Sequence, residues 1–320
     1  MNDKRRTGEE KAMNSSTTTL VTGAGGFLGT HTVERLLGEG CRVRAVDRDE
    51  KKIRDNLGAV ANDPALEVEI DDLLTISPED SLFSGVDYLF HCAGIADHAP
   101  SMREPELYME GNVMAFVRVL EAARFHSMKR VVNPSSAAVY GTATWPTRED
   151  HPKNPVSPYG FTKWMAEMAG QHWNQVFGVP TVSFRIFNGY GPRAFRYGVV
   201  SIFLNKRLAG ETVILSGDGN QKRDFIYITD IVDAFVRGAH RAADGAVYNL
   251  GSGRPRTLND LVKAMGLSVE HGPSRPGEPE VICADISKIT ADLSWSPKVS
   301  LEQGVANLLA ENGLVPTPVP

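Results

Sequence analysis

The feature that most constrains this chain is a set of glycines at a strand-to-helix junction. Residues 22–29 read TGAGGFLG, so Gly23, Gly26 and Gly29 follow an apolar segment and open a helix-like one. Glycines at this spacing allow a tight turn and a close backbone approach, and a helix N-terminus attracts a pyrophosphate. Because the chain contains 30 glycines, the spacing is weak by itself and depends on its surroundings.

The surrounding pattern alternates short apolar segments with longer helical ones. The predicted strands of this part are 19–23, 42–47, 66–70, 87–94, 130–136 and 181–188, and the predicted helices are 27–39, 105–125 and 158–177. Such alternation predicts parallel βαβ units, and continuous apolar runs suit a sheet that is covered on both faces. We therefore predict an α/β fold built on a Rossmann-type doubly wound parallel sheet.

The rhythm loosens after about residue 188, where turns rich in Gly and Pro separate shorter elements. Helices are predicted near 199–209, 230–241, 257–265, 285–293 and 301–311. This pattern indicates a smaller C-terminal α/β lobe for the substrate. The predicted division is a disordered polar tail over 1–16, a cofactor-binding domain over 17–187 and the second lobe over 188–320, with some segments returning to the first domain.

The amino-acid composition argues against several kinds of binding partner. With 34 basic and 39 acidic side chains the net charge is −5, which disfavours a dedicated nucleic-acid-binding protein. The 3 cysteines are too few and too scattered for a disulfide framework, so we expect a reducing, cytoplasmic location. No long uncharged apolar run suggests a membrane span. The histidines lack ligand spacing, and no metal is expected.

Asp47 ends the second predicted strand, 24 residues after Gly23. A carboxylate near this offset accepts hydrogen bonds from the adenosine ribose and repels the additional phosphate of NADP. Arg44 and Arg48 lie nearby and could accommodate that phosphate. We expect NAD, with NADP as the open alternative.

A second chemical pattern is Tyr159 and Lys163 in SPYGFTK, where the i, i+4 spacing places both on one helix face. An ammonium group near a phenol favours phenolate, which lowers the tyrosine pKa toward that of a working general base. Ser135 and Ser136 end the strand over 130–136, so a hydroxyl is expected at the sheet crevice where ligands bind.

Together these residues resemble the extended short-chain dehydrogenase/reductase family, and within it the NAD-dependent nucleotide-sugar epimerases and dehydratases, such as UDP-glucose 4-epimerase. The resemblance covers the chain from residue 18 to about 309. Its motifs are TGAGGFLG, HCAG (91–94), EGNVMA, PSSAAVYG, SPYGFTK, RIFNGYGPR (185–193), GDGNQKRDFIYITD (217–230), NLGSG (249–253) and RPGEP (275–279).

The resemblance implies a role for each matching residue. Ser136, Tyr159 and Lys163 correspond to the catalytic triad. The implied cofactor contacts, besides Tyr159 and Lys163, are Gly23, Gly26, Phe27, Leu28, Gly29, Asp47, Asp72, Leu73, Ala93, Gly94 and Asn112. The implied substrate contacts are Ser136 and, on the diphosphate of a UDP-sugar, Asn188, Arg223 and Arg275. The family further implies a homodimer formed through the helices near 105–125 and 158–177.

Residues 137 and 138 bear on which reaction follows. Family members that dehydrate or decarboxylate the sugar usually carry an acid just after the catalytic hydroxyl, whereas Ala137 and Ala138 cannot move a proton. This favours a C4 epimerase of a UDP-hexose or UDP-hexuronate that works through a 4-keto intermediate. The stretch around RIFNGYGPR resembles the decarboxylase branch, so a uronate held by Arg193 or Arg196 stays open.

Three alternatives remain at this stage: a dehydratase or decarboxylase, a 4-ketoreductase using exchangeable NADPH, and a non-catalytic dinucleotide-binding protein. One departure from the family pattern is Pro134, which removes a ladder donor near the end of a strand and is expected to disturb the position of Ser136.

Overall fold

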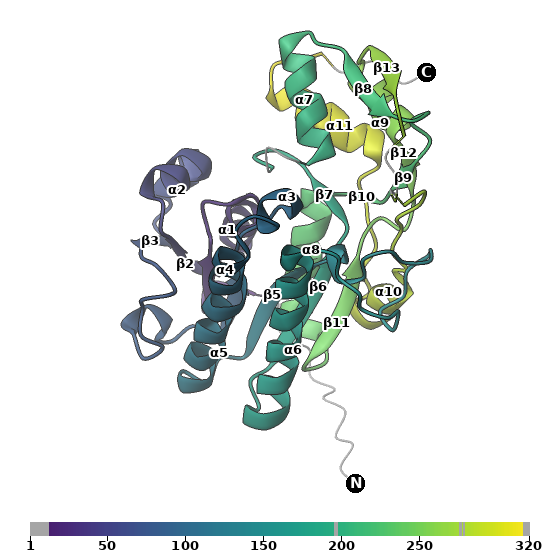
Figure 1. The fold of residues 1–320 in the computed structure, drawn as a ribbon. Coiled ribbons are helices and arrows are strands. Elements are labelled where there is room, and N and C mark those ends of the chain that lie inside the picture. Colours follow the sequence, from purple (N-terminus) through teal and green to yellow (C-terminus); the bar gives the residue numbers. More distant parts are fainter. Residues whose placement is uncertain (1–12, 195–197, 275–276, 278, 316–320) are drawn as a thin grey trace.

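The computed structural model describes residues 13–194, 198–274, 277 and 279–315. Its centre is a seven-stranded sheet in the order β11-β6-β5-β4-β1-β2-β3, with every neighbouring pair parallel (Figure 1). The strands are β1 (Thr18–Thr22), β2 (Arg42–Asp47), β3 (Leu66–Ile70), β4 (Tyr88–His91), β5 (Arg130–Ser136), β6 (Thr181–Ile186) and β11 (Ala246–Leu250). The order reverses between β1 and β4, which opens a crevice at their carboxyl ends.

Helices cover both faces of the sheet. One apolar cluster includes Val33 and Leu36 of α1 (Phe27–Gly38) together with Ile231 and Phe235 of α8 (Ile228–Arg241). A second cluster contains residues of α5 (Ala115–Phe125) and α6 (Pro158–Phe177), which lie side by side in Figure 1. Because both faces are buried, all five residues of β1 are buried as well. The predicted doubly wound sheet is confirmed.

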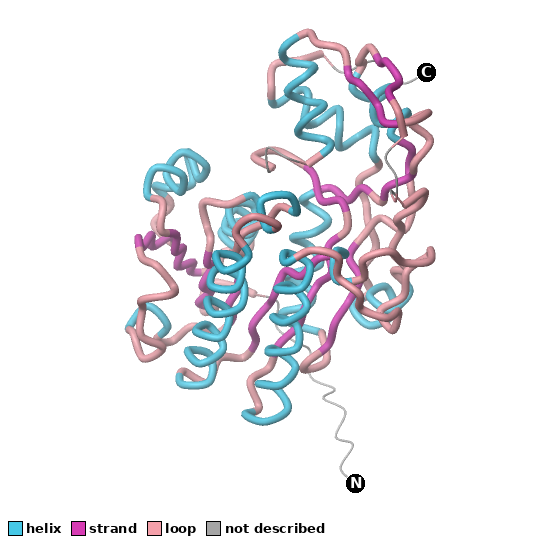
Figure 2. Tube along the Cα trace, viewed as in Figure 1, coloured by secondary structure: helices cyan, strands magenta, loops and turns pink. Residues whose placement is uncertain are grey.

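Most of the remaining elements form a smaller part above the carboxyl ends of the strands, whereas α2 (Glu50–Leu57) lies on the side of β2 and β3, and α10 (Ser287–Leu293) lies beside β11 (Figure 1). Figure 2 shows that loops join its short strands. Its strand pairs are β7 (Asn188–Tyr190) with β10 (Phe225–Tyr227), β9 (Lys222–Arg223) with β12 (Arg256–Thr257), and β8 (Val213–Ser216) with β13 (Val269–Gly272). Besides α2 and α10, the helices outside the main layers are α3 (His98–Ser101), α7 (Val199–Ala209), α9 (Leu258–Met265) and α11 (Leu301–Glu311).

Most predicted helices agree with the structure within two residues, and 199–209 and 301–311 match α7 and α11 at both ends. The predicted helix over 105–125 is instead divided into α4 (Pro105–Tyr108), a π-helical turn at Met109–Met114 and α5. A π turn carries one more residue than an α turn, and it marks the position of Asn112, a predicted site residue.

The predicted disordered tail over 1–16 is too long. Residues 1–12 lie outside the described residues, but Met13 is 4% exposed and belongs to the large apolar cluster. The next residues form a local turn in which the Ser16 N–H donates to Asn14 Oδ1 at 2.9 Å. Burial of the thioether side chain therefore orders the chain before residue 17. Among the described residues, no helix is long and apolar enough to cross a membrane.

Candidate active site

The glycine turn brings α1 close to the ends of β1 and β4. Gly23 has φ +63°, and a Cβ there would lie 2.5 Å from the backbone of Ala93. Gly26 is the N-cap of α1, where no side chain caps the helix and the first turn has no acidic residue. The positive end of the helix dipole is therefore not neutralised by the protein at this point, and it faces the crevice that the sheet topology opens.

A cavity of about 250 Å³ lies at this helix end. The predicted cofactor residues that line it are Gly23, Gly26, Phe27, Leu28, Asp47, Asp72, Leu73, Ala93 and Gly94. The Asp47 carboxylate is anchored, because it accepts from the Gly25 N–H at 2.9 Å and from the Asp49 N–H at 3.1 Å. An uncapped helix N-terminus and a fixed carboxylate in one cavity are the groups that a dinucleotide requires.

The two arginines near Asp47 differ in where they point. The Arg44 guanidinium donates to Glu67 and to the carbonyls of residues 81, 82 and 84, and Arg44 does not line the cavity. Arg48 lines the cavity and lies 4.0 Å from the carboxylate of Asp72. Arg44 is therefore held away from the position of a ribose phosphate.

Gly29 and Asn112, both predicted cofactor contacts, do not line either cavity of the site. A Cβ at Gly29 would lie 2.1 Å from the Gly23 carbonyl oxygen, so glycine is needed there for packing of α1 against the turn. The Asn112 amide accepts from the Ile95 N–H at 2.7 Å and donates to Thr162 Oγ1 at 3.0 Å. In the protein by itself, both residues support the walls of the site from behind, and their contact with the cofactor stays a prediction.

Ser136, Tyr159 and Lys163 line a second cavity of about 620 Å³. Phe27, Leu28, Cys92 and Gly94 border both cavities, so the two adjoin. Ser136 is the last residue of β5, while Tyr159 and Lys163 lie in the first turns of α6, which begins at the N-cap Ser157 with Pro158 in its first turn. The end of β5 and the start of α6 bring the three predicted catalytic residues together, as expected.

The electrostatics of this cavity differ from the expectation. Burial raises the pKa of Tyr159, and a hydrogen bond with the Ser136 side chain partly opposes that effect. Burial also lowers the pKa of Lys163 to about 8. The ammonium group of Lys163 donates to the Pro134 carbonyl at 3.0 Å and is not among the groups that shift Tyr159. The predicted lowering of the tyrosine pKa by Lys163 is therefore not observed in the protein by itself.

Pro134 does not interrupt its strand. β5 pairs with β6 without a break from Val131 to Ser136, whereas its pairing with β4 ends at Val132. Pro134 therefore lies beyond the last residue that needs a donor toward β4, and its carbonyl is used by Lys163 instead. The expected disturbance of Ser136 is absent for this reason.

Comparison with protein families agrees with this geometry. Residues 19–251 match the model of the NAD dependent epimerase/dehydratase family. The chain belongs to this family. UDP-glucose 4-epimerase of Mycolicibacterium smegmatis is 33% identical over 90% of this chain and 96% of its own length. The predicted family, the Rossmann-type fold, the NAD cofactor and, at the level of this family, the epimerase class are thereby confirmed.

Solved structures of the family are also similar. A UDP-N-acetylglucosamine 4-epimerase from Methanobrevibacter ruminantium in complex with UDP-N-acetylmuramic acid superimposes with a TM-score of 0.85 at 29% identity, covering 94% of this chain and 99% of that one. A UDP-glucuronic acid 4-epimerase from Bacillus cereus in complex with UDP-glucuronic acid and NAD gives a TM-score of 0.84 at 29% identity, covering 91% and 98%.

The predicted substrate residues of this family member fall in different places. Asn188 and Arg223 line the 620 Å³ cavity, and the Arg223 guanidinium donates to the Pro279 carbonyl at 3.0 Å. Arg275 lies outside the described residues. Arg193 points away from the cavity, because its guanidinium binds the Glu34 carboxylate at 2.7 and 2.8 Å. The structure therefore gives no support to Arg193 as a uronate ligand, and Arg196 lies outside the described residues.

Sequence reasoning missed two titratable residues of the same cavity, Asp97 and His98. Asp97 has φ 109°, a conformation that strongly favours glycine. The His98 ring lies 3.2 Å from Ser157 Oγ and 6.1 Å from the Tyr159 ring. They stand three and four residues after the HCAG motif, where the chain leaves the carboxyl end of β4 and begins α3. This position is the signal that would have indicated them.

Proposed function

We propose that this protein is an NAD-dependent C4 epimerase of a UDP-sugar. The observation that carries the proposal is the meeting of Ser136, Tyr159 and Lys163 in a cavity that adjoins the dinucleotide cavity. The two residues after Ser136 are alanines in a short 3-10 turn, so neither of the two positions directly after the catalytic hydroxyl carries an acid.

Each residue of the triad has a defined task in this proposal. As phenolate, Tyr159 takes the proton of the sugar C4 hydroxyl, and it returns the proton after the 4-keto sugar has turned over. Ser136 donates a hydrogen bond to the reacting oxygen, and Lys163 carries the positive charge that holds the nicotinamide ribose and favours phenolate. Bound NAD supplies the remaining chemistry by accepting the C4 hydride and returning it to the opposite face.

Binding is divided between the two parts of the chain. Residues 17–187 form the cofactor domain of the proposal, in which the lining of the 250 Å³ cavity holds NAD. Residues 188–320 form the substrate lobe, with β11 returning to the main sheet. Asn188, Arg223 and Arg275 hold the diphosphate, since arginine binds phosphate oxygens with two parallel hydrogen bonds.

Two further parts of the proposal concern assembly and location. We infer a homodimer through α5 and α6, supported by the exposed apolar side chains on these helices. A cytoplasmic location is supported by the absence of disulfides in the described part of the chain, where Cys41, Cys92 and Cys283 are free.

Asp97 and His98 favour a second candidate function, 4,6-dehydration of the sugar. Dehydration needs an additional acid and base, which Ala137 and Ala138 do not offer but which a carboxyl and an imidazole in the same cavity do. The two functions differ in product, because epimerisation inverts C4 and dehydration leaves a 4-keto-6-deoxy sugar.

One experiment separates these possibilities. The purified protein, without added cofactor, is incubated with UDP-glucose, UDP-glucuronate, UDP-N-acetylglucosamine and dTDP-glucose, and the sugar signals are followed by proton NMR. We expect a C4-inverted product from a UDP-sugar. In the Tyr159→Phe variant the rate of formation of this product should fall at least about a hundredfold.

Other products would overturn the epimerase proposal. A 4-keto-6-deoxy sugar would identify a dehydratase, and loss of the carboxyl group would identify a decarboxylase. Reduction of an added 4-keto sugar nucleotide at the expense of added NADPH, without turnover of the four hydroxy sugars, would identify a ketoreductase, since an epimerase regenerates its own NAD. Dinucleotide binding without turnover of any sugar nucleotide would favour the non-catalytic alternative.

A further inference from the structure

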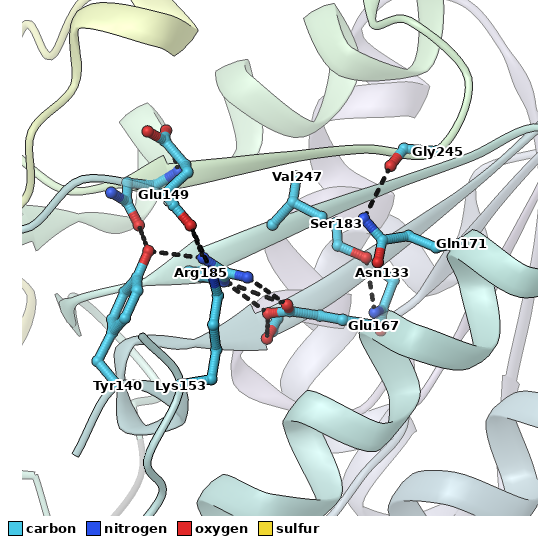
Figure 3. Close-up of polar contacts among 12 residues, drawn as sticks. Asn133, Tyr140, Glu149, Lys153, Glu167, Gln171, Ser183, Arg185, Gly245 and Val247 are labelled. Carbon is cyan, nitrogen blue, oxygen red and sulfur yellow. Dashed lines mark hydrogen bonds and ion pairs between the residues drawn. The ribbon is translucent and has the colours of Figure 1, made fainter. Parts of the chain in front are cut away.

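A buried ion pair lies beside the catalytic residues without taking part in the chemistry. Glu167 of α6 and Arg185 of β6 are 1% and 4% exposed. The Arg185 guanidinium donates to the Glu167 carboxylate from Nε at 3.0 and 3.1 Å and from Nη2 at 2.7 Å (Figure 3). A buried ion pair often contributes little net stability compared with apolar residues of the same volume, so this pair calls for another explanation.

The ion pair binds the chain just before Ser136. The Ser135 hydroxyl donates to Glu167 Oε1 at 2.5 Å. Ser135 also lies opposite Arg185 in the β5–β6 register, so both side chains point to the face that α6 covers. One residue earlier, the Pro134 carbonyl accepts from Lys163 at 3.0 Å. Two successive residues of β5 are therefore tied to α6 immediately before the catalytic hydroxyl.

The same ion pair binds the chain just after Ser136. Arg185 Nη1 donates to the Tyr140 hydroxyl at 2.7 Å and to the Glu149 carbonyl at 2.9 Å. Tyr140 ends the 3-10 turn that follows Ser136, and its hydroxyl in turn donates to Asn249 Oδ1 at 2.6 Å. Ser136 is thus bracketed by Ser135 and Tyr140, which both hydrogen-bond to the Glu167–Arg185 pair.

The other catalytic residues, Tyr159 and Lys163, lie in α6 together with Glu167. Tyr159, Lys163 and Glu167 follow one another at intervals of four residues, so they share one face of α6. Any displacement of Glu167 relative to β5 therefore changes the distance from Ser136 to Tyr159. We propose that Glu167 is a positioning residue, which together with Arg185 fixes Ser136 relative to Tyr159 and Lys163 for the reaction.

The negative charge of Glu167 also affects the pKa of Lys163, which lies on the same face of α6. Burial lowers the pKa of Lys163 to about 8, while Cys92 and the Glu167 carboxylate act in the opposite direction. The carboxylate thereby favours the protonated lysine.

The inference rests on the proposed function, and its test compares two buried serines of the same sheet. Ser135→Ala removes the bond to Glu167. The control is Ser183→Ala, which removes the bond from Asn133 Nδ2 to Ser183 Oγ at 3.0 Å, a buried contact between β5 and β6 that does not involve the ion pair (Figure 3). Steady-state kcat and KM are measured on whichever sugar-nucleotide conversion the wild type performs, and thermal unfolding monitors folding.

We expect Ser135→Ala to lower kcat about tenfold with little change in KM, because misplacement of a catalytic group slows the chemical step more than it weakens binding. Ser183→Ala should keep kcat within about twofold of wild type at a comparable loss of thermal stability. A double-mutant cycle with Glu167→Gln completes the test. If both residues act through one link, the double variant has about the kcat of Glu167→Gln.

Three results would overturn the inference. Ser135→Ala with the kcat of Ser183→Ala would indicate a purely structural contact. A rise in KM at constant kcat would indicate that Ser135 contacts the substrate directly. Losses of kcat that multiply in the double variant would show that Ser135 and Glu167 act independently. If Glu167→Gln does not fold, the comparison of the two serine variants decides, and a wild type without turnover overturns the proposed function and this inference together.

Discussion

At the scale of single residues, burial of Lys163 lowers the stability of the folded protein. The pKa of this lysine is lowered by burial from the ordinary 10.5 to about 8, so the folded protein holds the ammonium less favourably than the unfolded chain does. The resulting loss of stability is complete below about pH 8 and disappears as the pH rises toward 10.5. Sites that work on substrates commonly carry such a destabilising group.

We therefore predict that Lys163→Met is more stable than wild type at pH 7 and inactive. The gain in the free energy of unfolding should shrink as the pH rises from about 8 to 10.5, because the wild-type lysine loses its proton first in the folded state and, above about 10.5, in the unfolded state as well. Urea unfolding of both proteins at several pH values measures this difference. A variant that is less stable than wild type throughout this range would contradict the prediction, and it would indicate that the Lys163 bond to Pro134 outweighs burial.

At the scale of elements, Arg193 ties the segment after β7 to α1 and to the end of α2. Its guanidinium binds Glu34 of α1 at 2.7 and 2.8 Å and the Asn56 carbonyl at 2.7 Å. Burial tends to raise the pKa of Glu34, but hydrogen bonds from His31 and Arg193 prevail and hold it at about 2. The folded-state pKa lies below the ordinary 4.5, so this carboxylate stabilises the fold above about pH 4.5 and loses that effect as the pH falls toward 2.

Arg193→Met should accordingly lower the free energy of unfolding by about 1–2 kcal/mol at pH 6. The difference from wild type should narrow as the pH falls from about 4.5 toward 2, because Glu34 becomes protonated first in the unfolded chains and only near pH 2 in the folded wild type. Denaturant unfolding at these pH values tests the prediction. Arg254→Met is the matched control and should show no such pH dependence, because the backbone of Arg254, its N–H and its carbonyl, makes the hydrogen bonds to the Ser252 hydroxyl.

At the scale of the whole molecule, α5 and α6 lie together on one side of the sheet (Figure 1). Several apolar side chains of these two helices are exposed. Phe125 of α5 and Phe161, Met168 and Val176 of α6 are between 41% and 57% exposed. The spacing of the three α6 residues, seven and then eight, repeats along one helix face. Several exposed large apolar side chains on one helix face are typical of a protein interface.

We predict that the protein is a dimer in solution and that Met168→Glu, on the α6 face, shifts it to the monomer, because a buried unpaired carboxylate opposes association. Light scattering after size-exclusion chromatography measures the mass. Leu208→Glu, at a comparably exposed leucine of α7, is the control and should leave the dimer intact. A wild-type monomer at micromolar concentration would refute the predicted interface.

The sequence by itself determined the parts of this protein that depend on short-range order. The glycine turn before α1, the i, i+4 pair Tyr159 and Lys163, and the alternation of strands and helices could each be predicted, because local periodicity and turn geometry specify them. The meeting of Ser136 with Tyr159 was also predictable, since the helix that follows a strand of a parallel sheet begins near the edge at which that strand ends.

Only the tertiary structure decided which partner each polar side chain takes. Glu167 lies 18 residues from Arg185 along the chain, and nothing in their spacing distinguishes this pair from other pairs of opposite charge. The Arg193 guanidinium binds Glu34 and does not point into the 620 Å³ cavity. Asn112 lies behind the site on a π turn. Burial raises the pKa of Tyr159 and lowers that of Lys163. These outcomes depend on the solvent exposure and the competing hydrogen bonds of each group, which exist only once the chain has folded.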